Sequence, residues 1–307
     1  MSIDNLQTMI RKHKNPTVAG LDPKPEYIPP HIMHKHLSEH GETLLAAAEA
    51  YYEFNCGLID ALCDIVPAVK PQSAYYEMLG PDGSVALKKT IDYAKSKGLY
   101  VILDVKRGDI GSTAEAYSNA YLGQIIVGSS TIAPYDCDSI TVNAYLGSDG
   151  IKPFISTCKE HDKSIFALVK TSNPSSGELQ DLITGDRNLY TAVGDLISRI
   201  SADTIGEYGF SCVGAVVGAT YPSDMRALRK RLKNTFFLVP GYGAQGGGAE
   251  DVASAFTEYG HGAIINSSRA IMCAWKKTGG DGLDFGDAAR AEAINMRDDI
   301  KQHITIV

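Results

Sequence analysis

The stretch Val101-Ile-Leu-Asp-Val-Lys-Arg-Gly-Asp-Ile-Gly-Ser-Thr113 begins as an apolar β-strand and ends in a polar loop that contains glycine. Its first residues do not alternate between apolar and polar, which is typical of a parallel strand covered on both faces. The run Gly214-Ala-Val-Val-Gly-Ala219 has the same character. We therefore expect a parallel sheet that is buried under helices.

Similar runs of β-forming residues recur along the chain, and amphipathic helical stretches separate them. The expected strands span residues 17–22, 65–70, 99–106, 139–143, 164–170, 212–218, 235–240 and 263–267. Strands that alternate with helices predict right-handed βαβ units. Eight such units favour a closed (β/α)8 TIM barrel, of the α/β class, over a doubly wound open sheet.

The chain is longer than such a barrel requires. A typical (β/α)8 barrel needs about 250 residues, whereas this chain has 307. The surplus falls into a Pro-rich stretch at 23–40, a segment at 174–187 and a Gly/Asp-rich stretch at 276–287. No linker or repeat separates two parts, so we expect a single domain over residues 1–307 with insertions at these places.

Composition and charge exclude several classes of protein. The net charge of -7 argues against nucleic acid as a partner, because such proteins usually carry a basic field. The six cysteines form no C-x-x-C pair and are expected to be buried free thiols. No apolar run approaches the roughly 20 residues of a membrane span, and the N-terminus lacks a secretory h-region. We expect a cytoplasmic protein without a membrane partner.

Four histidines cluster in the first expected insertion: His31, His34, His36 and His40. The proline and charge content of this segment indicates a solvated surface element. We expect no metal here, because the spacing offers no convincing further ligands.

Charged residues stand at the ends of three successive expected strands. Asp104 and Lys106 are two apart on a strand, so their side chains point the same way, at the mouth of a barrel. Lys70 ends the preceding strand, Asp22 ends the first, and Asp109 follows in the loop. An ion pair that caps a strand would explain Asp104 and Lys106 alone. The whole set favours a shared polar cavity, because burying unpaired ions costs several kcal/mol each.

The pattern D…K…D-x-K-x-x-D resembles the catalytic array of the orotidine 5'-phosphate decarboxylase family, and the resemblance covers nearly the whole chain, in the longer bacterial branch. The D-x-K-x-x-D part is shared with related enzymes that act on sugar phosphates. Membership implies decarboxylation of orotidine 5'-phosphate to UMP and CO2, the last step of de novo UMP biosynthesis. It also implies that the reaction needs neither a cofactor nor a metal.

The resemblance implies a role for each strand-end residue. Lys106 resembles the lysine that protonates C6 of the pyrimidine, and Asp104 the carboxylate that faces the departing CO2. Lys70 resembles the lysine that braces this array and the ribose, which Asp22 also binds. Asp109 matches the segment that the partner of a homodimer inserts into the neighbouring site, as does Thr113 further along the loop.

Residues at later strand ends are expected to bind the rest of the substrate. Ser172 resembles a serine bonded to the pyrimidine, although Thr-Ser-Asn-Pro-Ser-Ser-Gly is also a generic turn. Asn143 is either a ligand or a strand-end cap. Barrels often bind phosphate with the loops after strands seven and eight, which here hold glycines and an arginine. Pro240 begins the first of these loops. By the resemblance, Gln245 and Arg269 hold the phosphate.

Two other functions remain open at this stage. One is a barrel lyase of the keto-gulonate-phosphate decarboxylase or hexulose-phosphate synthase type, which Lys70 and the glutamine-bearing loop argue against. The other is a barrel that only binds a nucleotide as a regulator, which the complete set of charged residues argues against.

Overall fold

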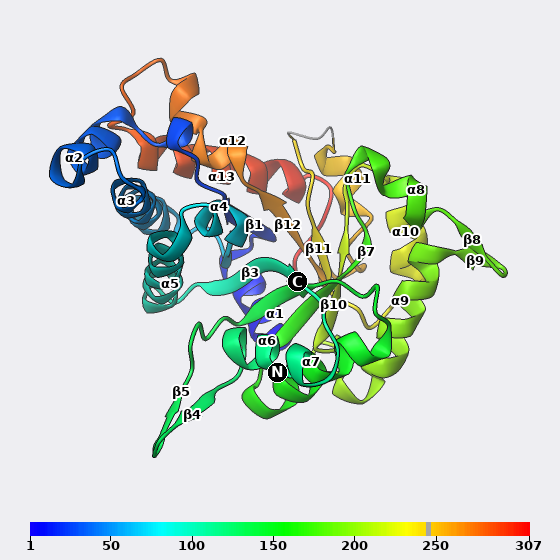
Figure 1. Cartoon of the computed structure of the whole chain (residues 1–307). Helices are drawn as coiled ribbons and strands as arrows, with labels where there is room; N and C mark the ends of the chain where they lie inside the picture. The colour runs from blue at the N-terminus through cyan, green and yellow to red at the C-terminus, as the bar shows by residue number, and fades with distance from the viewer. Residues whose placement is uncertain (244–246) are drawn as a thin grey trace.

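The computed structural model describes residues 1–243 and 247–307 and contains a closed barrel of parallel strands (Figure 1). Their order around the barrel is β1-β12-β11-β10-β7-β6-β3-β2. The strands are β1 Thr17–Leu21, β2 Ala68–Pro71, β3 Tyr100–Arg107, β6 Ser139–Val142, β7 Ser164–Lys170, β10 Val213–Val217, β11 Phe237–Val239 and β12 Ala263–Ser267. The expected (β/α)8 barrel is confirmed, and every expected strand lies within a few residues of an observed one.

Helices surround the barrel (Figure 1). They are α1 Ser2–His13, α2 Pro30–His40, α3 Leu44–Leu62, α4 Ser73–Glu77, α5 Gly80–Ser96, α6 Gly111–Tyr121, α7 Ser148–His161, α8 Gly177–Gln180, α9 Leu189–Ile200, α10 Pro222–Arg231, α11 Ala249–Ala253, α12 Arg269–Met272 and α13 Phe285–Lys301. Most carry one apolar stripe, as amphipathic helices over a sheet do. Apolar side chains between these stripes and the strands form the larger hydrophobic core.

A second core fills the inside of the barrel. Inward-pointing side chains such as Tyr100, Phe166 and Phe236 are almost completely buried there. Helix α1 closes the N-terminal end of the barrel with Ile3 and Leu6, which belong to the same cluster. Because this end is plugged by side chains, only the opposite end of the barrel can open into a binding site.

The three expected insertions contain short regular elements. The first forms η1 Pro25–Tyr27 and helix α2. The second forms η2 Pro174–Ser176, helix α8 and the hairpin β8 Ile183–Thr184 with β9 Arg187–Asn188. The third includes the end of η4 Ala274–Lys277 and the start of α13. The expectation of a solvated element at 23–40 is wrong in part, because α2 buries Ile32 and His36 against α3.

One protruding element is not among the strands that the sequence predicts. Strands β4 Ile125–Val127 and β5 Ser130–Ile132 form an antiparallel hairpin that extends away from the barrel (Figure 1). Its apolar residues are exposed, and Ile126 is 80% accessible to solvent. Two three-residue strands give too short a pattern to be recognised from alternation alone.

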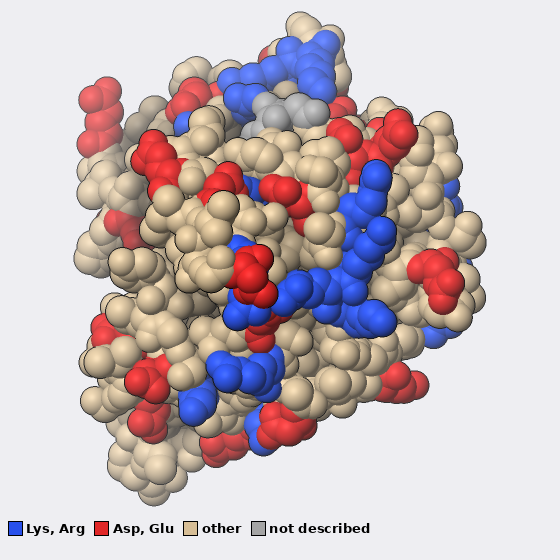
Figure 2. Space-filling view, turned by 90° about the vertical axis from the view of Figure 1, so that its right-hand side faces the viewer, with Lys and Arg blue, Asp and Glu red and all other residues tan. Residues whose placement is uncertain are grey.

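Charged side chains are unevenly distributed over one face of the molecule. Basic side chains form a band over the face of α9 and α10, with acidic side chains on both sides (Figure 2). Arg187 of β9 and Arg231 of α10 both pair with Asp195 of α9. All six cysteines are free, but only Cys137, Cys158 and Cys212 are buried; the other three are half-buried. No helix in the described ranges is long and apolar enough to cross a membrane.

Candidate active site

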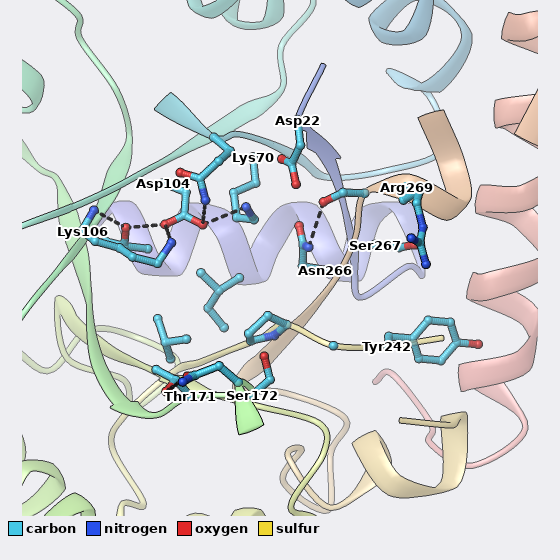
Figure 3. Close-up of a pocket in the computed structure, with 18 of the residues that line it drawn as sticks. Asp22, Lys70, Asp104, Lys106, Thr171, Ser172, Tyr242, Asn266, Ser267 and Arg269 are labelled. Carbon is cyan, nitrogen blue, oxygen red and sulfur yellow. Dashed lines mark hydrogen bonds and ion pairs between the residues drawn. The ribbon is translucent and has the colours of Figure 1, made fainter. Parts of the chain in front are cut away.

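The charged residues at the ends of β2 and β3 form one connected array (Figure 3). Lys70 Nζ donates to Asp104 Oδ2 at 3.0 Å, and Lys106 Nζ donates to Asp104 Oδ1 at 2.7 Å. Thr141 on the neighbouring strand β6 donates its hydroxyl to the same Oδ1 at 2.7 Å. The expectation that Lys70, Asp104 and Lys106 share a polar cavity is therefore confirmed.

The backbone of Lys106 departs from ordinary strand geometry. Its φ is 46°, in the left-handed region, and the pairing of β3 with β6 shifts register between Leu103 and Arg107. Such a conformation costs about 1–3 kcal/mol in a non-glycine residue and persists only where its surroundings impose it. Here Lys106 N donates to Thr141 Oγ1 at 2.9 Å. The irregularity turns the Lys106 side chain towards Asp104 and the cavity.

The array is buried at one end and accessible at the other. The side chains of Lys70 and Asp104 are 5% and 11% exposed, whereas that of Lys106 is 46% exposed. Burial alone would raise the pKa of Asp104, but the positive charges of Lys70 and Lys106 hold it well below its usual value. Burial would likewise lower the pKa of Lys70, but Asp104 and Asp22 outweigh this and raise it. Both buried groups are thus ionised at neutral pH.

Asp22 follows β1 and faces the same cavity. Its Oδ1 is buried and has no hydrogen-bond partner within residues 1–243 and 247–307. Figure 3 shows its carboxylate pointing into the space beside Lys70. A buried carboxylate oxygen without a donor is costly, so this atom is suited to accept a hydrogen bond from a bound hydroxyl group.

The cavity at the mouth of the barrel has a volume of about 730 Å³. Seven of the expected site residues line it: Asp22, Lys70, Asp104, Lys106, Ser172, Pro240 and Arg269. Three do not line it, namely Asp109, Thr113 and Asn143. Gln245 lies outside the residues that the structure describes.

The far side of the cavity differs in character from the charged array. Arg269, the first residue of α12, and Ser267 at the end of β12 lie across the cavity from Lys106 (Figure 3). Tyr242 stands nearby, and its hydroxyl donates to Asp299 at 2.5 Å. The cavity therefore suits an elongated molecule with its reacting centre at the array and an anionic group at the arginine.

The residues expected outside this cavity have other surroundings. Asn143 is exposed, and its Oδ1 accepts from Tyr145 N at 3.0 Å, which is a cap at the end of β6. Asp109 Oδ1 accepts from Ile110 N at 2.8 Å, and Thr113 is exposed on the first turn of α6. Within one chain these residues do not meet the array.

Sequence reasoning missed several residues of the site. Gln72 Nε2 donates to Asp104 Oδ2 at 3.0 Å, and Thr141 completes the ring of donors around this carboxylate. Thr141 shares a strand face with Asn143, so alternation along β6 could have indicated it. Gln180 also lines the cavity, but it comes from the second insertion, and only the folded chain brings it there.

The second insertion is tied to the site by a buried lysine. Lys170, the last residue of β7, is completely buried, and its ammonium pairs with Asp181. Gln180 accepts from Thr171 N at 2.9 Å and donates to Thr171 Oγ1 at 2.7 Å. These contacts fix the segment that carries Ser172 along the cavity wall.

Possible metal ligands gather elsewhere. Within the described residues, the group of three or more His, Cys, Asp or Glu side chains with suitable spacing is His36, Glu39 and His40 on α2. None of these residues lines the cavity. The array itself consists of lysines around an aspartate, and ammonium groups do not ligate cations.

Comparisons with known proteins agree on one family. The model of the "Orotidine 5'-phosphate decarboxylase / HUMPS family" matches residues 20–278. The chain is 43% identical to an orotidine 5'-phosphate decarboxylase of Rhodopirellula baltica, covering 96% of this chain and 97% of that one. It is 40% identical to one of Clostridium kluyveri, covering 98% and 97%. The crystal structure of a putative orotidine-monophosphate-decarboxylase of Toxoplasma gondii superposes with a TM-score of 0.77 at 30% identity, covering 98% of each chain.

Proposed function

The chain belongs to the orotidine 5'-phosphate decarboxylase / HUMPS family, and from this premise we propose that it converts orotidine 5'-phosphate to UMP and CO2. It is an enzyme of this family, and its reaction is the last step of UMP biosynthesis. The observation that carries the proposal is the Lys70–Asp104–Lys106 array, which faces Arg269 across one cavity.

The proposed reaction takes place beside Lys106. The bond between C6 and the carboxylate breaks, CO2 leaves, and the electron pair stays on C6. The ammonium of Lys106 stabilises this carbanion and then gives it a proton, which forms UMP. The neutral amine regains its proton from water, to which the half-exposed Lys106 has access.

Most of the acceleration in this proposal is electrostatic. A general acid typically contributes only ~10²–10⁴-fold, whereas enzymes that act on very slow reactions lower the barrier by up to about 23 kcal/mol. Fixed charges aimed at the developing carbanion can supply more, because they need no reorganisation. Asp104 is held by Lys70, Gln72, Lys106 and Thr141, so the charges around C6 are set in place before the substrate binds.

The other residues bind the rest of the nucleotide. Asp22 accepts a hydrogen bond from a ribose hydroxyl group, and Ser172 contacts the pyrimidine. Arg269 pairs with the phosphate together with Gln245, and Pro240 begins the glycine-rich stretch of sequence that contains Gln245. Binding energy from the phosphate, which does not react, serves to hold the pyrimidine against the array.

The proposed reaction uses no cofactor and no metal ion. An absorbance assay of the full chain with orotidine 5'-phosphate in the presence of EDTA tests this directly. We expect full turnover. Loss of turnover that a divalent ion restores, or turnover of a keto-sugar phosphate instead, would favour the related barrel lyases. Binding of UMP without any turnover would favour a regulatory barrel.

We further propose a cytoplasmic homodimer in which each chain completes the active site of the other. Asp109 and Thr113 follow β3 in the chain but do not line the cavity of their own chain, which supports a role in the site of a partner. In a two-fold dimer each chain offers the same patch to the other. Neither nucleic acid nor a membrane is part of this proposal.

Mixing two inactive variants, Lys106→Ala and Asp109→Ala, tests the shared site. In a mixed dimer, one site carries both defects and the other has every residue intact. Random exchange makes about half the dimers mixed, so roughly a quarter of wild-type activity returns. No recovery, after subunit exchange is confirmed with labelled chains, would contradict a shared site.

A further inference from the structure

Helix α2 presents three potential metal ligands on one face. His36, Glu39 and His40 occupy positions i, i+3 and i+4, which are neighbours on a helix surface. Glu39 Oε2 lies 3.8 Å from His36 Nδ1 and 3.8 Å from His40 Nε2. All three ligand atoms lie within 4.8 Å of one another. The two imidazole rings are nearly parallel, at 10°, with their centroids 6.2 Å apart.

The surroundings of His36 leave one of its nitrogens available. Its side chain is only 8% exposed, and Nε2 lies 2.7 Å from Glu53 Oε2 on α3. A carboxylate only accepts hydrogen bonds, so this contact places the ring proton on Nε2. Nδ1 then has a free lone pair, and this buried atom has no hydrogen-bond partner in the described part of the chain. A buried polar atom without a partner is costly.

Although the spacing of these histidines alone indicates no metal site, we propose that His36 Nδ1, Glu39 Oε2 and His40 Nε2 bind a divalent transition-metal ion of the Zn²⁺ class, with water completing the coordination. Two imidazoles and a carboxylate suit such ions, which prefer nitrogen and oxygen ligands. The contact from Glu53 to His36 is the outer carboxylate that metal-binding histidines commonly have, since it fixes the tautomer and the ring orientation.

Glu39 and His40 are exposed enough to move towards an ion, whereas His36 is fixed in place. Zinc–nitrogen bonds measure about 2.0–2.1 Å, so the ligand atoms must draw slightly closer together. His36 is fixed by its burial and by Glu53, whereas Glu39 and His40 have 50% and 33% exposed side chains. These two can turn towards the ion at little cost in packing.

The consequence of binding is structural. Helix α2 follows η1 in the first insertion, and Lys24 and Tyr27 at η1 line the catalytic cavity. Besides His36, Lys35 also binds Glu53, at 2.6 Å, and so attaches α2 to α3. An ion at the C-terminal turn of α2 strengthens this attachment and steadies the insertion. The ion takes no part in the decarboxylation, and this proposal does not depend on the proposed reaction.

The test uses the full chain after EDTA treatment and dialysis, with Co²⁺ as a spectroscopic probe. We expect one ion per chain, visible absorption bands of Co²⁺ bound to nitrogen and oxygen, displacement by Zn²⁺, and a rise in the melting temperature with Zn²⁺. His40→Ala and Glu39→Gln each remove a ligand on the surface of the fold. Both should lower the affinity by more than about tenfold.

Two further variants make the test specific. His34→Ala removes an exposed histidine of the same helix that is outside the ligand set, and it should leave the affinity unchanged. Glu53→Gln should weaken binding by about tenfold, although the side chain at this position does not touch the ion. The proposal is overturned if wild type takes up no stoichiometric ion. It is equally overturned if His40→Ala and Glu39→Gln bind like wild type, or if His34→Ala lowers the affinity as much as they do.

Discussion

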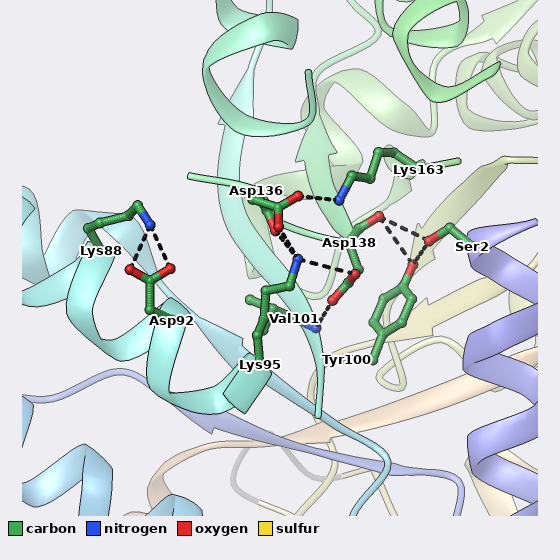
Figure 4. A network of polar contacts seen from close by, with 9 residues as sticks. All are labelled: Ser2, Lys88, Asp92, Lys95, Tyr100, Val101, Asp136, Asp138 and Lys163. Atoms are coloured by element: carbon green, nitrogen blue, oxygen red, sulfur yellow. Dashed lines mark hydrogen bonds and ion pairs between the residues drawn. The ribbon is translucent and has the colours of Figure 1, made fainter. Parts of the chain in front are cut away.

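Two networks of charges contact strand β3 at opposite ends of the barrel. At the mouth, Asp104 on β3 binds the ammonium groups of Lys70 and Lys106. At the closed end, Asp138 Oδ2 accepts from Val101 N, near the start of the same strand, at 2.8 Å (Figure 4). Both networks join β3 to β6 or to the loop that precedes it, but their charges face different surroundings.

In the network at the closed end, the charged side chains pair with one another. Asp136 accepts from Lys95 at 2.6 Å and from Lys163 at 2.7 Å (Figure 4). Tyr100 continues the network inwards through a hydrogen bond of 2.8 Å with Ser2 of α1. This network closes the bottom of the barrel, and each carboxylate in it has a donor from the chain.

The network at the mouth keeps unsatisfied groups. Lys106 is 46% exposed and has a left-handed backbone, while Asp22 Oδ1 is buried without a partner among the described residues. Strain and unpaired polar atoms cost stability and are found at functional sites. Ion pairs within the chain, such as Lys163 with Asp136, stabilise the fold, whereas charges left open to the cavity serve the ligand. Changes at the two ends should therefore affect different measured quantities.

One such change concerns the arginine at the far side of the mouth. Arg269→Ala should lower kcat/KM for orotidine 5'-phosphate by about 10–100-fold, the equivalent of 1.5–3 kcal/mol for a hydrogen bond to a charged group. It should hardly change the poor reaction of orotidine, which lacks the phosphate. The free energy of unfolding should stay close to that of wild type. Equal losses with both substrates would refute the assignment of Arg269.

The converse effect is expected at the closed end. Lys163→Ala removes a side chain that is 10% exposed and leaves Asp136 with fewer donors. The free energy of unfolding in urea should fall by about 1–2 kcal/mol, while kcat stays within about twofold. Lys159→Ala, which breaks an exposed pair with Asp203, is the matched control and should cost less. A large fall in kcat for Lys163→Ala would show that the network at the closed end also affects catalysis, which would contradict this assignment.

A smaller effect depends on pH. Burial raises the pKa of Asp138, despite its hydrogen bond from Val101. A carboxyl whose pKa is higher in the folded state loses stability as the pH rises from its unfolded pKa, about 3.9, through the raised value. Asp138→Asn does not titrate and can still accept from Val101. Its stability relative to wild type should therefore increase between about pH 4 and about pH 7.

Urea unfolding of wild type and Asp138→Asn at both pH values checks this prediction. All other titrating groups are common to the two proteins and cancel in the difference. A fall in the stability of Asp138→Asn relative to wild type as the pH rises would contradict the assigned direction.

The sequence predicted best those features that follow from the regular geometry of a single strand. Apolar runs located the strands, and the two-residue period placed Asp104 and Lys106 on one face. Strand ends of a barrel meet at one mouth, which brought Lys70 and Asp22 to the same cavity. These relations depend on the regular geometry of strands, so they could be inferred before any side chain was placed.

Other features depend on contacts between distant segments. Gln180 reaches the cavity only because Lys170 and Asp181 hold the second insertion. Thr141 lies on the strand face of Asn143, but threonine is common in any strand, so its residue type alone indicated no role. The burial of His36 is not predicted by the sequence, because nothing in residues 23–40 indicates its contact with Glu53 on the next helix. Asp109 and Thr113 stay predictions, since their proposed partner is another chain.

In the proposed mechanism, Lys106 performs the chemical step, whereas other residues bind the nucleotide and hold the fold. Lys106→Ala separates these roles when single-turnover decarboxylation, calorimetric binding of UMP and urea unfolding are measured on the same preparation. We expect a fall in rate of at least about 10⁴-fold, a Kd for UMP within about tenfold of wild type, and a free energy of unfolding within about 1 kcal/mol of wild type. A near-normal rate, or a loss of UMP binding as large as the loss of rate, would contradict it.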